Sequence, residues 1–149
     1  MHGRHYQRLL IMTALSFAAM YVFMYAMVNV FTNAIPNLNQ FYMAGLMAAP
    51  MVIIELLVMR SMYPNRRLNA AIIASSAVAL LAFWIGIRQQ VAINDTQFLK
   101  SMIPHHAGAI LMCEKVQSKA PEIRKLCSEI IASQQAEIDQ MRALLNSGS

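Results

Sequence analysis

The chain has 149 residues, of which 58% are hydrophobic and 13% are charged, and its mean hydropathy is +0.45. Soluble globular domains carry roughly 25% charged residues, so the composition excludes an ordinary soluble domain. The net charge is +5. Residues 1–87 contain five arginines and one glutamate, giving +4, and residues 88–149 contain seven basic and six acidic side chains, giving +1. Because the excess flanks apolar segments, we expect no nucleic-acid partner.

Three long apolar segments account for the low charge content. They are about Leu9–Phe31, Phe41–Met59 and Leu68–Ile87. Each is close to the ~20 residues that a helix needs to cross a bilayer. Lipid offers no hydrogen-bond partner to backbone amides, so these segments are expected to be helices. We therefore predict a three-helix transmembrane region over residues 9–90, and the protein is expected to be integral to a membrane.

The flanking charges predict the orientation of these spans. Arginines precede the first span and lie between the second and third spans, whereas Thr32–Gln40 carries no charge. By the positive-inside rule, residues 1–8 form a cytoplasmic N-terminus and residues 91–149 an external domain. In a bacterium this is the inner (plasma) membrane with a periplasmic domain. The first apolar segment is longer than a typical signal-peptide core, so we expect an uncleaved anchor.

The external residues read as two amphipathic helices. Asn94 or Asp95 can cap the first, which is predicted to run to about Gln117. Pro121 suits the first turn of the second helix, which is predicted to continue to about Leu145. Two helices cannot close a core alone, and a four-helix bundle made from two hairpins is the natural closure. The predicted fold class is all-α, and we expect a homodimer.

The first of these helices carries a concentrated set of soft and borderline metal donors. They are Met102, His105, His106, Met112 and Cys113. Thioether, thiolate and imidazole together favour copper, above all Cu(I). At about 100° per residue, Met102, Ala109 and Cys113 follow an apolar seam that also takes in Phe98 and Val116. His105 and His106 flank this seam about 100° apart, so they need not share one ion.

Polar residues of the second helix fall at the same level. Gln134 and Glu137 lie within its apolar stripe, which includes Leu126 and Leu144. An antiparallel hairpin places His106 beside Gln134 and Cys113 beside Cys127. Gln134 and Glu137 could then orient metal-bound histidines, as outer ligands commonly do. A hydrogen-bonded network without metal would satisfy the same groups.

This part of the chain resembles the bacterial domain of unknown function 305. One matching run is Asp95-x-x-Phe98-Leu99-x-x-Met102-Ile103-Pro104-His105-His106-x-x-Ala109-Ile110-x-Met112. The other is Pro121-x-Ile123-x-x-Leu126, followed by Ile130-Ile131-x-x-Gln134-x-x-Glu137-Ile138-x-x-Met141. The resemblance covers roughly residues 94–145 and implies an exported, ferritin-like helical bundle. Some relatives are periplasmic copper-binding proteins, which implies copper ligands at Met102, His105, His106 and Met112. The cysteines and the three spans lie outside the resemblance.

Two interpretations of the cysteines stay open. Outside the cytoplasm, Cys113 and Cys127 can form a disulfide across the hairpin. Such a bridge closes a loop of about 15 residues and would contribute ~3 kcal/mol on the chain-entropy model. Alternatively, one or both thiolates bind copper.

The sequence thus predicts a methionine-rich, membrane-anchored copper-binding protein, with thirteen methionines in the chain. Its expected role is copper sequestration, tolerance or hand-off to copper-handling proteins. The alternative is a non-metal membrane assembly protein whose hairpin only oligomerises. We expect no enzyme, because a ferritin-like di-metal oxidase needs inward Glu-x-x-His pairs, which the hairpin lacks.

Overall fold

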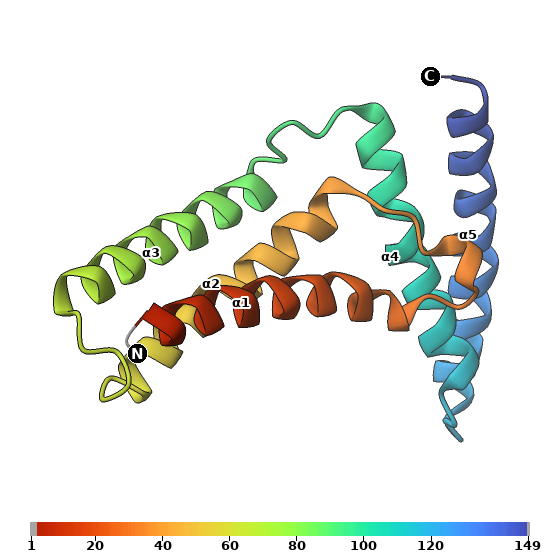
Figure 1. Cartoon of the computed structure of the whole chain (residues 1–149). Helices are drawn as coiled ribbons and strands as arrows, with labels where there is room; N and C mark the ends of the chain where they lie inside the picture. The colour runs from red at the N-terminus through yellow and green to blue at the C-terminus, as the bar shows by residue number, and fades with distance from the viewer. Residues whose placement is uncertain (1–2, 149) are drawn as a thin grey trace. The chain divides into compact units, whose positions relative to one another are not determined.

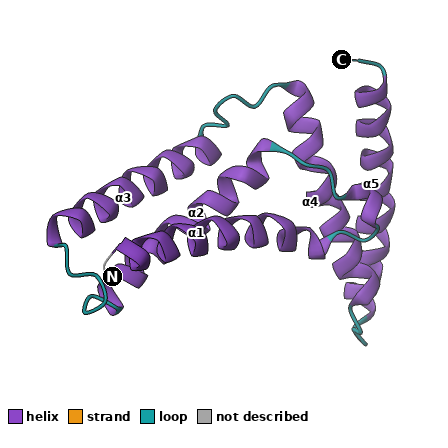
Figure 2. Ribbon diagram, in the orientation of Figure 1, coloured by secondary structure: helices purple, strands orange, loops and turns teal. Residues whose placement is uncertain are grey.

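The computed structural model describes residues 3–148, which form helices joined by short connections (Figures 1 and 2). The elements are α1 (Gly3–Phe23), η1 (Met24–Met27), η2 (Phe31–Asn33), α2 (Leu38–Val58), α3 (Arg66–Arg88), α4 (Asp95–Lys115) and α5 (Pro121–Asn146). The described residues contain no strand, so the predicted all-α class is confirmed. Residues 1 and 2 of the predicted N-terminal segment 1–8 lie outside the described residues.

The chain divides into two compact units. The span unit contains the chain up to Phe23 together with Asn39–Ala92. The hairpin unit contains Met24–Leu38 together with the residues from Ile93 onward. The sequence placed the boundary of the external domain near residue 91, and the structure adds Met24–Leu38 to the same compact body. We call Met24–Leu38 the strap.

Three helices are long and apolar enough to cross a membrane. They cover Arg4–Met27, Leu38–Val58 and Arg66–Arg88. The first ends four residues before the predicted Phe31. Its end is set by Asn29, whose side-chain oxygen accepts hydrogen bonds from the backbone amide of Val30 and the side chain of Asn33. Such local bonds compete with helix continuation.

The span unit packs with small residues inside and large apolar residues outside. Gly45 illustrates the close approach, because a Cβ there would lie 2.4 Å from the ring of Phe83. Outward-facing side chains include Leu15, Val58 and Val78, which are 66%, 76% and 69% exposed. An apolar outer surface is what helices surrounded by lipid require.

A polar cluster closes one end of the span unit. The side chain of Asn69 accepts a hydrogen bond from the Tyr6 hydroxyl at 2.7 Å and donates one to the Tyr63 carbonyl at 2.8 Å. The Tyr63 hydroxyl donates to Glu55 Oε1 at 3.3 Å. Burial raises the pKa of Tyr63, and the nearby Glu55 carboxylate raises it further.

In the hairpin unit, α4 and α5 run antiparallel, as predicted. The Asn94 side chain accepts from the Gln97 amide at 2.9 Å and caps α4, and Pro121 occupies the first turn of α5. Helix α4 ends at Lys115 because Val116 is extended, two residues before the predicted end. The buried core consists of Leu99, Ile103, Ala107, Ile110, Ile138 and Met141.

The strap forms a third layer on this hairpin. Val28 and Ile35 pack against the hairpin core. Arg142 of α5 donates to the Thr32 carbonyl at 2.8 Å and to Asn33 Oδ1 at 2.6 Å. Asn33 is itself only 3% exposed. The connection between the first two spans is therefore an integral part of the hairpin unit.

The strap changes which helix faces are buried. The sequence analysis placed Phe98 and Val116 inward, but each is 48% exposed. On α5, Leu126 and Leu144 were placed in the inner stripe and are 50% and 41% exposed. The core faces of both helices are rotated toward the strap, which covers a side that a two-helix hairpin would leave to water. The predicted seam is therefore wrong by part of a turn.

Candidate metal centre

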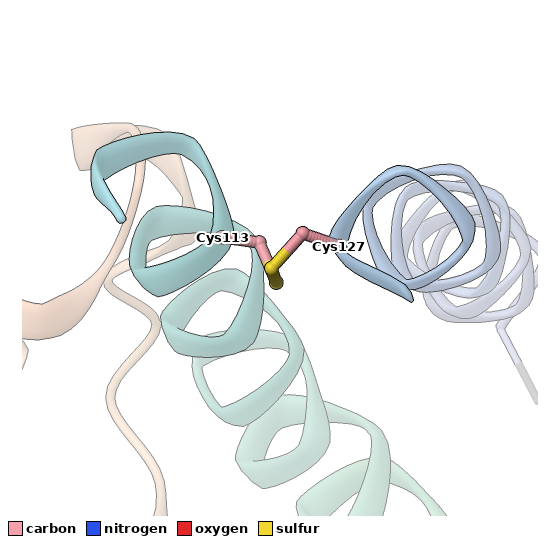
Figure 3. Close-up of a disulfide and its surroundings, with 2 residues drawn as sticks. All are labelled: Cys113 and Cys127. Atoms are coloured by element: carbon pink, nitrogen blue, oxygen red, sulfur yellow. A yellow bond between two sulfur atoms is a disulfide. The ribbon is translucent and has the colours of Figure 1, made fainter. Parts of the chain in front are cut away.

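The cysteines are joined across the hairpin. Cys113 of α4 and Cys127 of α5 form a disulfide, with their Cα atoms 5.0 Å apart (Figure 3). Of the two interpretations left open by the sequence, the structure has the disulfide. The bridged Cys113 has no thiolate to offer a metal, so it does not act as a copper ligand in this state.

His106 is held between two oxygen atoms. Its Nδ1 lies 2.9 Å from the Met102 carbonyl oxygen, and its Nε2 lies 2.5 Å from Glu137 Oε2. The imidazole side chain is 11% exposed, whereas the Glu137 side chain is 49% exposed. Ser133 donates from Oγ to the other carboxylate oxygen of Glu137 at 3.3 Å.

This arrangement occupies both ring nitrogens of His106. A carbonyl oxygen only accepts, so Nδ1 must carry a proton. Nε2 either donates to the Glu137 carboxylate or accepts a proton from it. In both cases neither nitrogen has a free lone pair. His106 can therefore bind a metal only after its contact with Glu137 opens.

The predicted outer residues play different parts. Glu137 reaches His106 as expected, but it bonds to Nε2, the nitrogen that would face a metal. Gln134 lies half-buried on α5 three residues before Glu137. The bonds that fix the His106 ring come from Met102 and Glu137 instead.

His105 and Met112 lie in a different environment. The His105 side chain is exposed, and Met112 is 56% exposed. They lie two turns apart on one side of α4, about 10 Å along the axis. Met102 is half-buried and packs against the hairpin core. The five predicted ligands are therefore spread over three places, and residues 3–148 contain no cluster of three or more His, Cys, Asp or Glu side chains that could hold a metal.

His105 and Met112 belong to a largely apolar surface that we call the open face. Its exposed apolar side chains, each 41–56% exposed, are Phe98, Met112, Val116, Ile123, Leu126 and Leu144. These residues recur at helical spacing on one side of α4 and α5. The strap contacts other sides of both helices, reaching Gly108 and Arg142. The open face thus combines apolar area with exposed soft donors.

Comparison with known proteins identifies the hairpin. Residues 86–146 match the family described as Domain of unknown function (DUF305). Over 144 aligned residues the chain is 34% identical to an uncharacterized protein of Acanthamoeba polyphaga mimivirus, and the alignment covers 93% of this chain and 91% of that protein. The chain belongs to the DUF305 family. The alignment extends beyond the DUF305 region into the apolar N-terminal segments, and no solved structure matches the chain.

The strap was missed by sequence reasoning. Thr32–Gln40 was interpreted as an uncharged external connection, with no role beyond joining two spans. Its asparagines were a usable signal, because a short segment rich in amides can replace water as a partner for buried backbone groups. Asn33 does so by accepting from Arg142, and Asn37 by donating to the Ile35 carbonyl at 3.0 Å.

Proposed function

We propose that this DUF305 protein is a membrane-anchored copper-binding protein. The observation that carries the proposal is the exposure of an imidazole and a thioether, those of His105 and Met112, on the open face. Both donors suit Cu(I), and no hard carboxylate ligand accompanies them. Three candidate membrane spans supply the anchor.

The ligand assignment is narrower than the sequence suggested. His105 and Met112 are the primary ligands, and Met102 is a reserve thioether at the edge of the hairpin core. His106, bonded to Glu137, keeps the two helices in register, and Cys113 is bonded to Cys127. We assign a binding role, in sequestration, tolerance or hand-off to other copper-handling proteins, and no enzymatic activity.

The proposed sidedness follows the charges. The N-terminus and the Arg60–Arg67 region lie on the cytoplasmic side, and the hairpin unit on the other side. In a bacterium with two membranes this places the hairpin in the periplasm. An oxidising compartment also suits the disulfide between Cys113 and Cys127. Homodimerisation through the open face would close a four-helix bundle.

A second candidate is a membrane assembly protein that binds no metal. It is favoured by the His106–Glu137 contact and the disulfide, which satisfy the polar groups of the hairpin without a metal. In that case the open face would serve only for packing.

Copper titration of the purified full chain separates the two candidates. A chromophoric Cu(I) chelator competes with the wild type, His105→Ala, Met112→Leu and the control Met43→Leu, which removes an exposed thioether from α2. We expect the first two substitutions to weaken Cu(I) binding at least tenfold and the control to leave it unchanged. Equal binding by all four proteins would refute the assignment of these ligands, and no binding by the wild type would favour the assembly protein.

A further inference from the structure

The open face carries an incomplete metal site in each chain. His105 and Met112 are about 10 Å apart along α4, which is too far for one ion to bond both at the roughly 2.0–2.3 Å typical of metal–ligand bonds. Met102 is drawn toward the core, and His106 has no free nitrogen. A two-ligand site therefore needs a donor from outside the chain.

The spacing of the two donors is symmetric about small residues. Gly108 and Ala109 lie midway between His105 and Met112. The contacts between His106 and Glu137 and between Cys113 and Cys127 place residues near Ser133 of α5 at the same level. Small side chains at one level of both helices allow a second pair of helices to approach closely there.

We propose that a second copy of this chain packs on the open face, with a two-fold axis at the level of Ala109 and Ser133. Helix α4 then runs antiparallel to α4 of the other copy, and α5 antiparallel to α5. His105 of each chain comes level with Met112 of the other. The dimer holds two equivalent sites, each with one imidazole nitrogen and one thioether sulfur, for one Cu(I) each. This proposal rests on the copper-binding function proposed above and specifies where its ligands come from.

Three features of the open face favour a second copy as the occupant. The two-fold arrangement pairs the donors with each other, whereas a lipid surface or an unrelated protein supplies no matching donor. Six half-exposed apolar side chains expose on the order of a few hundred Å² per chain, the size of a functional patch on a monomer. The segment 88–149 has a net charge of +1, so two copies repel each other little.

A cis–trans comparison of mixed dimers tests the proposal. Full-length chains with two different affinity tags are co-expressed, and mixed dimers are purified in detergent through both tags in turn. In the trans pair one chain carries His105→Ala and the other carries Met112→Leu. In the cis pair one chain is wild type and the other carries both substitutions. The probe is Cu(I) alone, delivered against a chromophoric chelator.

Shared sites predict opposite results for the two pairs. The trans pair keeps one complete site, so it should bind one Cu(I) per dimer with the affinity of the wild type. The cis pair keeps none and should bind at least tenfold more weakly. If each chain held its own site, the cis pair would bind one Cu(I) and the trans pair none, and this result would overturn the proposal.

The controls separate this proposal from the copper-binding function. A wild type that binds no Cu(I) contradicts the proposed function itself. A wild type that binds Cu(I) as a monomer overturns only the shared site. Leu126→Glu places a charge on the open face without removing a ligand. It should make the chain monomeric and weaken Cu(I) binding at least tenfold, and a monomer with undiminished binding would contradict the shared site.

Discussion

Two adjacent histidines occupy different chemical environments in this protein. The peptide geometry of a helix turns His105 and His106 about 100° apart. One ring is held between the Met102 carbonyl and Glu137, and the other is exposed. Neighbouring residues of the same type can therefore serve structure and ligand binding separately, and the sequence motif alone does not distinguish them.

The His106–Glu137 contact is expected to stabilise the hairpin. Glu137→Gln removes the charge of the pair, which is partly solvent-exposed, so the loss should be about 1 kcal/mol. We predict about fivefold faster hydrogen exchange of protected amides in α4 and α5. The matched control is Glu129→Gln, since Glu129 makes a loose, exposed pair with Lys125 at 4.0 Å. Equal exchange rates in the two variants would show that the contact is not stabilising.

Tyr63 provides a test of the polar cluster in the span unit. Its pKa is raised by burial and by Glu55. The folded state therefore favours the protonated phenol. This contribution to stability is complete below the unfolded pKa of about 10 and is lost as pH rises through the higher folded pKa. The difference between alkaline absorbance titrations of the wild type and Tyr63→Phe should show a phenol that ionises above pH ~10. Ionisation at or below that value would mean that Tyr63 is not buried beside Glu55.

At the scale of helices, the sequence predicted positions better than faces. Apolar length located the three spans, and Asn94 and Pro121 marked the starts of α4 and α5. The buried faces of α4 and α5 depend on what packs against them, and the strap is distant in sequence. Phe98, Val116 and Leu126 were therefore placed inward although they lie on the open face. Local periodicity cannot contain the information that a segment some 70 residues away covers one side.

The candidate site shows the same limit. The residue types were identified from the sequence, and the pairing of Cys113 with Cys127 was one of its two alternatives. The convergence of all five donors was not found, because His106 turns toward Glu137 while His105 and Met112 turn outward. A projection of one helix cannot decide between these directions.

The strap should be held mainly by Arg142. Its guanidinium bonds to the Thr32 carbonyl and to Asn33, and hydrogen bonds to charged groups contribute roughly 1.5–3 kcal/mol. In Arg142→Gln we expect faster hydrogen exchange in the strap, with α4 and α5 still protected. Arg124→Gln, at an exposed position of α5, is the control. Uniform loss of protection throughout the hairpin would instead indicate that the strap and the hairpin unfold together.

For the whole molecule, three spans put the two ends of the chain on opposite sides of a membrane. The strap follows the first span and the hairpin follows the third, and both belong to one compact unit. Their common side agrees with an odd number of spans. The account therefore depends on α1, α2 and α3 all crossing the bilayer.

Labelling of single introduced cysteines tests this topology, because Cys113 and Cys127 are bonded to each other. A membrane-impermeant maleimide added to intact cells should label Ser147→Cys, beyond the last turn of α5. It should not label Ser61→Cys, in the connection between α2 and α3, until the membrane is opened. Labelling of both positions from the same side would exclude three spans.

The coordination of copper in the full-length protein tests the central claim most directly. X-ray absorption of the Cu(I)-loaded chain should show sulfur and imidazole nitrogen in the first coordination shell. The sulfur contribution should disappear in Met112→Leu and the imidazole contribution in His105→Ala. A shell of oxygen and nitrogen alone, unchanged by either substitution, would contradict the claim that this membrane protein holds copper through soft donors on its DUF305 hairpin.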